Sequence, residues 1–539
     1  MWGGVLKTNL MQYENRTLRE EDYRPVLDYI RSGWNELTRA MDDCASLTDV
    51  KVMSHPVLYL PDGFAVPARV AEMQGTCYVQ VRTLPRKIER MGDVKPEDLP
   101  APGLLYLPRP YVVPGGRFNE MYGWDSYFIL LGLLADGLHS LGKGIVDNFL
   151  FEIQYYGTVL NANRTYYLTR SQPPFLTAMI FEVYRKPHSF DDPESAHEWL
   201  TRAYRLASKY YETWTDPDHL AGDTGLARYF DLDHGPVPEL ADDSRYFHHV
   251  IQWLLDHPEQ NPGYLMPTMS SNGHTVGRCN PQTGTMHEQA CVNGFQLTPD
   301  FYLGDRAMRE SGFDTTFRFG PFSGSTHHYA PVCLNSLLFR YEREMAEMAQ
   351  EIGESDDIPI WNARATRRAE AIHKYLWIDE KRQFLDYNFR DGSSSNYSYL
   401  STYYPMWAGL ATKYQAAVLS KQLHLFEHSG GLAMSSTATG MQWDEPFGWA
   451  PVNWIASKGL YDYGFYKEAF RIAESFLETV NSSFAADATV REKYDVEQGN
   501  ADVHVTAGYK DNVIGFGWTN GVYLKMVQML NGDESTLPE

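Results

Sequence analysis

The sequence lacks the features that mark disulfide-rich, zinc-binding, secreted and membrane-spanning proteins. Its first ten residues, MWGGVLKTNL, contain no long apolar core, so we expect no secretory signal. Its longest apolar stretch, Tyr127–Leu134, is too short to span a bilayer. Cysteines are few, odd in number and far apart, with no CxxC pair, so neither a disulfide framework nor a zinc site is expected. These cysteines are Cys44, Cys77, Cys279, Cys291 and Cys333. We therefore predict a cytoplasmic protein.

Positive charge is also scarce. The chain has 47 Lys and Arg residues against 69 Asp and Glu residues, a formal net charge of −22. Such a surface repels phosphates, so neither nucleic acid nor an anionic membrane is expected as a partner. Aromatic residues reach 14%, which is high. This excess fits either a large aromatic core or a carbohydrate site lined in part by aromatic rings.

Strand-like alternation is rare in the sequence, and helical periodicity dominates. Apolar residues recur at steps of three and four over residues 23–41, 338–352 and 465–480. Long loops rich in Gly, Pro, Trp and charge separate the helical segments. They cover residues 106–126, 160–175, 221–240, 310–333, 440–452 and 491–521. A toroid of helix pairs would place all of these loops around one mouth.

No Ser-rich or Pro-rich linker divides the 539 residues. We predict two parts: an N-terminal extension over residues 1–95, and a larger domain over residues 96–539 whose helical toroid the extension packs on.

Two segments combine the residue types that bind a sugar ring. They are Pro114–Tyr127 (PGGRFNEMYGWDSY) and Gln442–Pro451 (QWDEPFGWAP). Each holds carboxylates, amide or guanidinium donors and tryptophan rings within a few residues. Sugar hydroxyls need charged hydrogen-bond partners, and the C–H faces of the ring need flat apolar surfaces. The two segments are far apart along the chain, so only tertiary structure can bring them together.

These two segments resemble the two signature motifs of the trehalase family, glycoside hydrolase family 37. Further matches follow in the family's order, at Asn161–Phe175, Leu334–Leu337, Glu492–Val496 and Gly515–Gly521. The resemblance implies an all-α fold, an (α/α)6 barrel with long active-site loops. It also implies hydrolysis of an α-glucosidic bond with inversion, without a metal or a cofactor.

Hydrolysis with inversion needs one carboxyl group that protonates the leaving oxygen and one carboxylate that activates water. The resemblance assigns the acid to Asp314, within the SGFD segment, and the base to Glu492, within EKY. Each assignment has an alternative. Asp314 also suits the N-cap of a helix, and Glu492 also suits a surface ion pair with Lys493 or Arg491.

The resemblance also implies a set of sugar-binding residues. For the tryptophans among them the alternative role is core packing, and for the arginines it is a buried ion pair that holds loops. The set is Arg117, Phe118, Trp124, Asp125, Asn161, Arg170, Gln172, Glu239, Gly312, Trp443 and Trp518.

The sequence departs from the family pattern on the side that should hold the leaving group. Val237 stands where trehalases have an Arg in a PRPE segment, and that change removes a planar five-donor group. Residues 497–514 lack the family's glycine-rich lid. Cys333 replaces the usual Asp before the LNS match. An added stretch around residues 241–300 has the size of an active-site lid, or of a peripheral decoration.

From these departures we predict an inverting glycoside hydrolase that releases glucose from a small α-glucoside other than trehalose, with glucosylglycerol the favoured substrate. One alternative is a true α,α-trehalase, which cleaves trehalose to two glucose molecules. A remote alternative is a catalytically silent sugar-binding protein. The expected partner is thus a small-molecule α-glucoside, and no oligomeric state is predicted.

Overall fold

A ring of helices forms the centre of the molecule. The computed structural model describes residues 20–47, 56–240, 245–268, 279–280, 289–506 and 512–532. Each helix of the ring contacts the next, and the last contacts the first, so the ring is closed. The ring helices are α5 (Asp125–Ala135), α7 (Leu176–Tyr184), α11 (Val332–Ile352), α13 (Tyr404–Trp407), α15 (Ala450–Asp462) and α17 (Gly517–Asn531).

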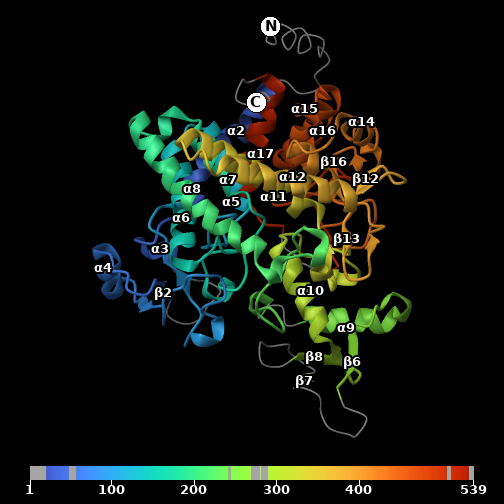
Figure 1. Ribbon diagram of the computed structural model, residues 1–539, viewed down its shortest axis with the longest axis horizontal. Coiled ribbons are helices and arrows are strands. Elements are labelled where there is room, and N and C mark those ends of the chain that lie inside the picture. The colour runs from blue at the N-terminus through green and yellow to red at the C-terminus, as the bar shows by residue number, and fades with distance from the viewer. Residues whose placement is uncertain are drawn as a thin grey trace.

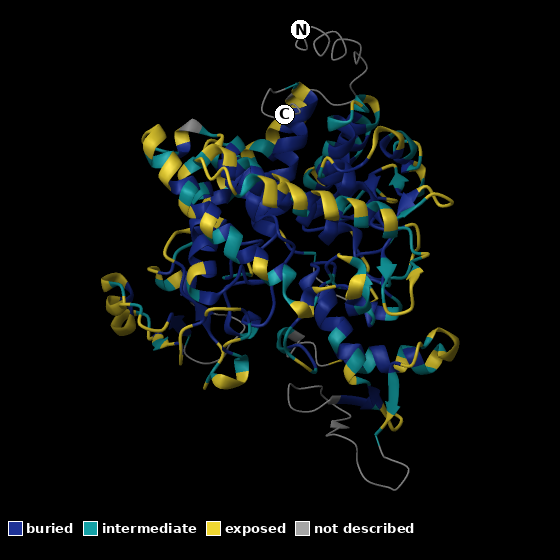
Figure 2. Cartoon of the chain, viewed as in Figure 1, coloured by how far each residue is buried: buried dark blue, intermediate teal, exposed yellow. Residues whose placement is uncertain are grey.

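A second set of helices lies outside the ring. These helices are α2 (Glu20–Leu37), α6 (His139–Tyr156), α8 (Pro193–Thr215), α12 (Ile358–Tyr375), α14 (Lys413–Leu419) and α16 (Tyr466–Asp487). The two sets differ in sequence for a physical reason. Helix α5 is buried around almost its whole circumference, and its residues are apolar on every side. Helix α8 buries one stripe, including Trp199, Ala203 and Tyr210, and exposes the opposite face (Figure 2).

This inner and outer arrangement confirms the predicted all-α, (α/α)6 barrel. The periodic segment 338–352 lies within α11, and the segments 23–41 and 465–480 lie for the most part in α2 and α16. The division at residue 95 stays a prediction, and within residues 1–95 the helix α2 packs against α16 and α17. None of the helices in the described part of the chain is long and apolar enough to cross a membrane.

The β-structure is limited to short pieces between helices. Strand β2 pairs in parallel with β3 and β4, and most of the other pairs are two-residue antiparallel ladders. The strands outside residues 241–300 are β1 (Thr38–Arg39), β2 (Val57–Leu60), β3 (Gln80–Thr83), β4 (Leu104–Leu105), β5 (Tyr111–Val112), β10 (Tyr329–Ala330), β11 (Trp377–Ile378), β12 (Gln383–Phe384), β13 (Tyr387–Asn388), β14 (Ser393–Ser394), β15 (Glu427–His428), β16 (Gly431–Leu432), β17 (Phe447–Gly448) and β18 (Tyr494–Asp495).

The expectation that the cysteines form no disulfide framework is wrong. Cys44, the first residue of α3 (Cys44–Leu47), is disulfide-bonded to Cys77, which directly follows α4 (Ala68–Thr76). Their Cα atoms are 5.4 Å apart, although 33 residues separate them along the chain. Cys291 is also disulfide-bonded, and Cys333 is free and buried. Packing of distant elements brings these thiols together, and residue spacing alone does not reveal it.

The added stretch around residues 241–300 forms a small unit with a hydrophobic cluster of its own. It contains α9 (Tyr246–Asp256), the strands β6 (Leu265–Pro267), β7 (Cys279–Asn280), β8 (Gln289–Val292) and β9 (Phe295–Leu297), and the start of α10 (Pro299–Glu310). Its cluster includes Phe322 and Met441, which belong to two of the long loops. Figure 1 shows α9 and β6 to β8 at the bottom of the view, away from most of the ring. Residues 241–244, 269–278 and 281–288 lie outside the described part.

Candidate active site

A cavity of about 90 Å³ lies where the long loops enter the ring helices. Asp125 begins α5, Trp449 directly precedes α15, and Trp518 is the second residue of α17. All six loops singled out in the sequence contribute residues to its lining. The predicted residues that line it are Phe118, Trp124, Asp125, Asn161, Arg170, Gln172, Glu239, Gly312, Asp314, Trp443, Glu492 and Trp518.

Arg117 is the one predicted residue that the structure does not bring into this lining. Its side chain is exposed, and its guanidinium carbon lies 4.9 Å from the centre of the Phe118 ring.

Backbone pairing brings the distant motifs together. Strands β17 and β18 pair antiparallel, which sets the second motif beside the EKYDV segment. Tyr122, in the first motif, forms a β-bridge with Ala162, in the segment that supplies Asn161. The amide of Trp443 donates a 3.0 Å hydrogen bond to the carbonyl of Thr315, next to Asp314. These local pairings explain why residues so far apart along the chain share one cavity.

Gly312 occupies a position where a side chain would not fit. Its φ is +76°, a left-handed conformation that L-residues rarely adopt. A Cβ atom there would lie 2.9 Å from the indole of Trp124, closer than real Cβ contacts allow. This close approach places Trp124 directly against the segment that carries Asp314.

The tryptophans form a connected aromatic wall. The rings of Trp443 and Trp449 are stacked, with centroids 3.9 Å apart and an interplanar angle of 4°. Trp518 packs edge-on against Trp449 at 5.5 Å, and Trp124 lies 5.7 Å from Trp518. These rings are buried and also line the cavity, so core packing and a sugar-facing surface are compatible roles for them.

The second motif holds the segment that bears Asp314. Gln442 Nε2 donates a hydrogen bond to the carbonyl of Asp314. The buried carboxylate of Asp444 accepts hydrogen bonds from Thr316 Oγ1 at 2.6 Å and from the amide of Phe317 at 2.9 Å. No helix begins at Asp314, which argues against the N-cap alternative. Gln442 and Asp444 therefore fix the backbone around the carboxyl group of Asp314.

The electrostatic surroundings of Asp314 suit a proton donor. Burial raises the pKa of Asp314 to about 7, against the opposing positive charges of Arg309 and Arg170. Arg309 Nη1 lies 3.6 Å from Asp314 Oδ2. A carboxyl group with this pKa is protonated in a large share of molecules near neutral pH.

Glu492 is buried and does not form the surface ion pair considered as its alternative. Its carboxylate accepts a 3.1 Å hydrogen bond from Lys493 Nζ, which is itself completely buried. The ammonium of Lys493 lies 5.2 Å from the centre of the Trp449 ring. Trp518 Nε1 donates to the carbonyl of Glu492 at 3.1 Å. Glu492 therefore faces the cavity with a charge partner behind it and a fixed backbone.

Asp125 adds a third carboxyl group to the cavity. Burial, together with the negative charges of Glu492 and Asp314, raises the pKa of Asp125 to about 8. Both of these charges belong to carboxyl groups that line the same cavity as Asp125.

Arg170 and Glu239 form a buried ion pair at the edge of the cavity. Arg170 Nη1 is also 3.7 Å from Asp231 Oδ2. Burial alone would raise the pKa of Glu239, but the charges of Arg170 and Arg309 outweigh it and hold that pKa below its usual value. For Arg170 the structure therefore shows the alternative role, a buried ion pair, and sugar binding by Arg170 and Glu239 stays a prediction.

Sequence reasoning missed Arg309, which also lines the cavity. Its guanidinium pairs with Asp305 through contacts of 3.0 and 3.2 Å, and both residues lie on α10. In the sequence, Asp305 and Arg309 are four residues apart directly before the SGFD segment, but that spacing is equally typical of an exposed ion pair on a helix.

The departures from the family pattern leave the charged groups that line the cavity in place. Val237 packs within the second hydrophobic cluster and is not part of the lining. The guanidinium of Arg309 faces the cavity, next to Glu239 and Asp314. Cys333 is buried outside the cavity, 3.5 Å from Arg318, which pairs with Asp386. Of the interval 497–514, residues 507–511 lie outside the described part.

The comparisons with known proteins agree with this site. A family model described as Trehalase matches residues 5–531. The chain belongs to the trehalase family. It is therefore a glycoside hydrolase. The curated relatives include the cytosolic neutral trehalase of Saccharomyces cerevisiae, 34% identical over 92% of this chain and 70% of that protein. Another is the cytosolic neutral trehalase of Neurospora crassa, 34% identical over 92% and 72%.

Solved structures show the same relation. The neutral trehalase of Saccharomyces cerevisiae superposes with a TM-score of 0.75 at 32% identity, covering 95% of this chain and 96% of that chain. A family 63 mannosylglycerate hydrolase from Thermus thermophilus, in complex with glucose, gives a TM-score of 0.50 at 16% identity, covering 77% and 95%. That second likeness concerns the fold alone.

These relatives contradict the preference for glucosylglycerol. Proteins named trehalases resemble the trehalase-family chain over most of its length, which overturns the argument from altered residues. The physical reason is visible in the cavity. The loss of an arginine at position 237 does not leave the site without a guanidinium, because Arg309 supplies one from a neighbouring helix.

Proposed function

We propose that this protein is a trehalase that hydrolyses α,α-trehalose to two glucose molecules with inversion at one anomeric carbon. The observation that carries the proposal is that Asp314 and Glu492 line one cavity, each in surroundings suited to its role. The names of the relatives support trehalose as the substrate.

Asp314 is the general acid in this proposal. Its protonated carboxyl group donates a proton to the oxygen that joins the two sugars as the bond to C1 breaks. Gln442 and Asp444 keep the carboxyl group in place by holding residues 314–317.

Glu492 is the general base. Its carboxylate takes a proton from a water molecule, and the water oxygen bonds to C1 on the face opposite the leaving sugar. The leaving glucose departs with the proton from Asp314, so atoms and charge balance without a metal or a cofactor.

The remaining lining residues bind the substrate in this proposal. Asp125, Asn161 and Gln172 supply polar groups for the hydroxyls of the glucose that undergoes attack. Trp124, Trp443 and Trp518 offer flat apolar surfaces to its C–H faces. Arg170, Glu239 and Arg309 are charged groups suited to the second glucose, with Phe118 at the rim.

Proton NMR of the first turnovers tests the proposed reaction. Hydrolysis of trehalose by inversion must yield equal amounts of α-glucose and β-glucose, because only the attacked carbon changes configuration. We expect both anomers at a ratio of one to one before mutarotation. Maltose serves as a control sugar that should be cleaved far more slowly. Release of α-glucose alone, or no release from trehalose, would contradict the proposal.

The pH dependence of kcat/KM follows from the raised pKa of Asp314. The acid must be protonated, so activity is retained below about pH 7 and falls about tenfold per pH unit above it. We expect this fall in kcat/KM above about pH 7, the alkaline limb of the pH profile, in rates measured from pH 5 to 9.

The Arg309→Gln variant tests whether the alkaline limb of the pH profile reports the ionisation of Asp314. Arg309→Gln removes a positive charge that lowers the pKa of Asp314, so the limb moves to higher pH, whatever happens to the absolute rate. The exposed Arg69→Gln variant is the matched control and should leave the limb in place. A limb that stays in place in Arg309→Gln, or that moves to lower pH, would refute the assignment.

Three further points belong to the proposal. The relatives named cytosolic support a cytosolic location. The unit around residues 241–300 serves as a wall or lid of the cavity, a role supported by its packing against Phe322 and Met441. Residues 1–95 form an extension that packs on the barrel.

A further inference from the structure

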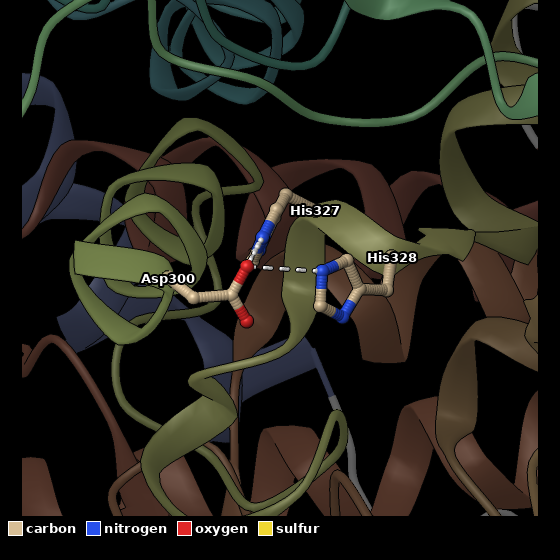
Figure 3. Close-up of side chains that lie close together, drawn as sticks. All are labelled: Asp300, His327 and His328. Atoms are coloured by element: carbon tan, nitrogen blue, oxygen red, sulfur yellow. Dashed lines mark hydrogen bonds and ion pairs between the residues drawn. The ribbon is translucent and has the colours of Figure 1, made fainter. Parts of the chain in front are cut away.

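A second cluster of ligating side chains lies outside the catalytic cavity. Asp300 is the second residue of α10, and His327 and His328 end the short helix η9 (Thr326–His328). Asp300 Oδ1 is 3.1 Å from His327 Nε2 and 3.4 Å from His328 Nε2 (Figure 3). The three ligand atoms lie within 4.8 Å of one another. None of these residues lines the catalytic cavity.

This donor set matches the preferences of a first-row divalent metal. Two imidazole nitrogens and one carboxylate oxygen are a common protein ligand set for Zn²⁺, with bonds of about 2.0–2.2 Å. Ligand atoms at the corners of such a tetrahedron are roughly 3.3–3.5 Å apart. The two distances from Asp300 Oδ1 are close to that spacing, so an ion can enter between these groups with small side-chain movements.

The three side chains are carried by backbone that is held in place. The carbonyl of His327 accepts a 2.8 Å hydrogen bond from Arg228 Nη1, and that of His328 accepts one of 3.1 Å from the amide of Phe389. Thr298 caps the helix that carries Asp300. His327 is buried, and its Nδ1 has no hydrogen-bond partner. A site on fixed elements loses little entropy when it binds an ion.

We propose that Asp300, His327 and His328 form a binding site for a divalent transition-metal ion, for which Zn²⁺ is the best match. The fourth position is open to water. The site has a structural role, because Asp300 and the two histidines bracket the segment that carries Asp314. An ion held by both ends of this segment closes the loop between them and stabilises the folded state.

Arg390 is the group that competes with the ion. Its Nη1 lies 2.6 Å from His328 Nε2 and 3.4 Å from Asp300 Oδ1. Its side chain is 63% exposed, so it can turn into solvent when a cation arrives. The competition gives the proposal a distinctive signature: removal of Arg390 should strengthen metal binding, although it weakens an ion-pair network.

Calorimetric titration of ZnCl₂ into the full-length protein, stripped with EDTA, tests the site. We expect binding of one ion per chain and a rise in the unfolding temperature. Asp300→Asn and His328→Ala should each weaken binding at least tenfold, and Arg390→Ala should tighten it about tenfold. His424→Ala is the matched control, because His424 is exposed and its Nδ1 donates a hydrogen bond to the carbonyl of Lys421, outside the proposed site.

Circular dichroism of each variant separates loss of the site from loss of the fold. The proposal is overturned if the stripped wild-type protein binds no Zn²⁺ at 100 μM. It is also overturned if folded Asp300→Asn and His328→Ala bind as the His424→Ala control does, or if Arg390→Ala fails to bind more tightly.

Discussion

Asp314→Asn is expected to lower kcat for trehalose by about 10³-fold or more while the protein still binds the sugar. The amide has nearly the shape of the carboxyl group but donates no proton to the leaving oxygen, so general acid catalysis is lost. Steady-state kinetics gives kcat, and calorimetric titration with trehalose gives the affinity. The backbone contacts around position 314 come from Gln442 and Asp444, and they remain in the variant.

Asp28→Asn is the control for this substitution, because Asp28 is exposed on α2 and should tolerate the change without loss of activity. Retention of more than a tenth of wild-type activity in Asp314→Asn would remove Asp314 from the role of acid. Loss of both sugar binding and the fold would assign it a structural role.

Glu492→Ala is expected to lose about 10³-fold in kcat, and azide should restore part of the rate. Azide is already a strong nucleophile and needs no base, so it can use the space that the deleted carboxylate leaves. The product should be β-glucosyl azide, detected by NMR or mass spectrometry, because attack comes from the face that water uses. Asp314→Asn should show no such rescue, since its leaving sugar still lacks a proton donor.

The Glu492→Ala substitution leaves the buried ammonium of Lys493 without its charge partner, which lowers the stability of the folded protein. Glu492→Gln, with a neutral side chain of similar size, therefore serves as a parallel variant for the loss of rate. Full wild-type activity in either folded variant would remove Glu492 from the role of base. Rescue that yields α-glucosyl azide would contradict inversion.

The fold and most of the cavity could be predicted because their signals are local. Helical periodicity lies in single segments, such as residues 338–352 within α11. The motif residues around Trp124 and Trp443 are dense in Gly and Trp because the chain must turn tightly beside flat rings. Gly312 illustrates the constraint, since a side chain there would overlap the Trp124 indole.

What the sequence did not reveal depends on side chains that meet only in the folded chain. Arg309 lies on an ordinary amphipathic helix, and nothing in its local pattern shows that it faces the cavity rather than solvent. The interpretation of Val237 was wrong for the opposite reason. Its place in an aligned motif indicated a lost substrate contact, whereas its side chain packs in a separate hydrophobic cluster. The bond between Cys44 and Cys77 likewise joins two short helices that spacing does not relate.

The contact between α5 and α17 has a consequence for biosynthesis. The first and last helices of the ring are neighbours, and the backbone of Gly521 packs against Phe128 and Gly132. A nascent chain on the ribosome therefore cannot complete its core until translation is nearly finished, because the apolar surface of α5 is buried in part by α17, the last helix to be synthesised. Premature termination before residue 517 would leave that surface open to aggregation, even with every assigned catalytic residue already synthesised.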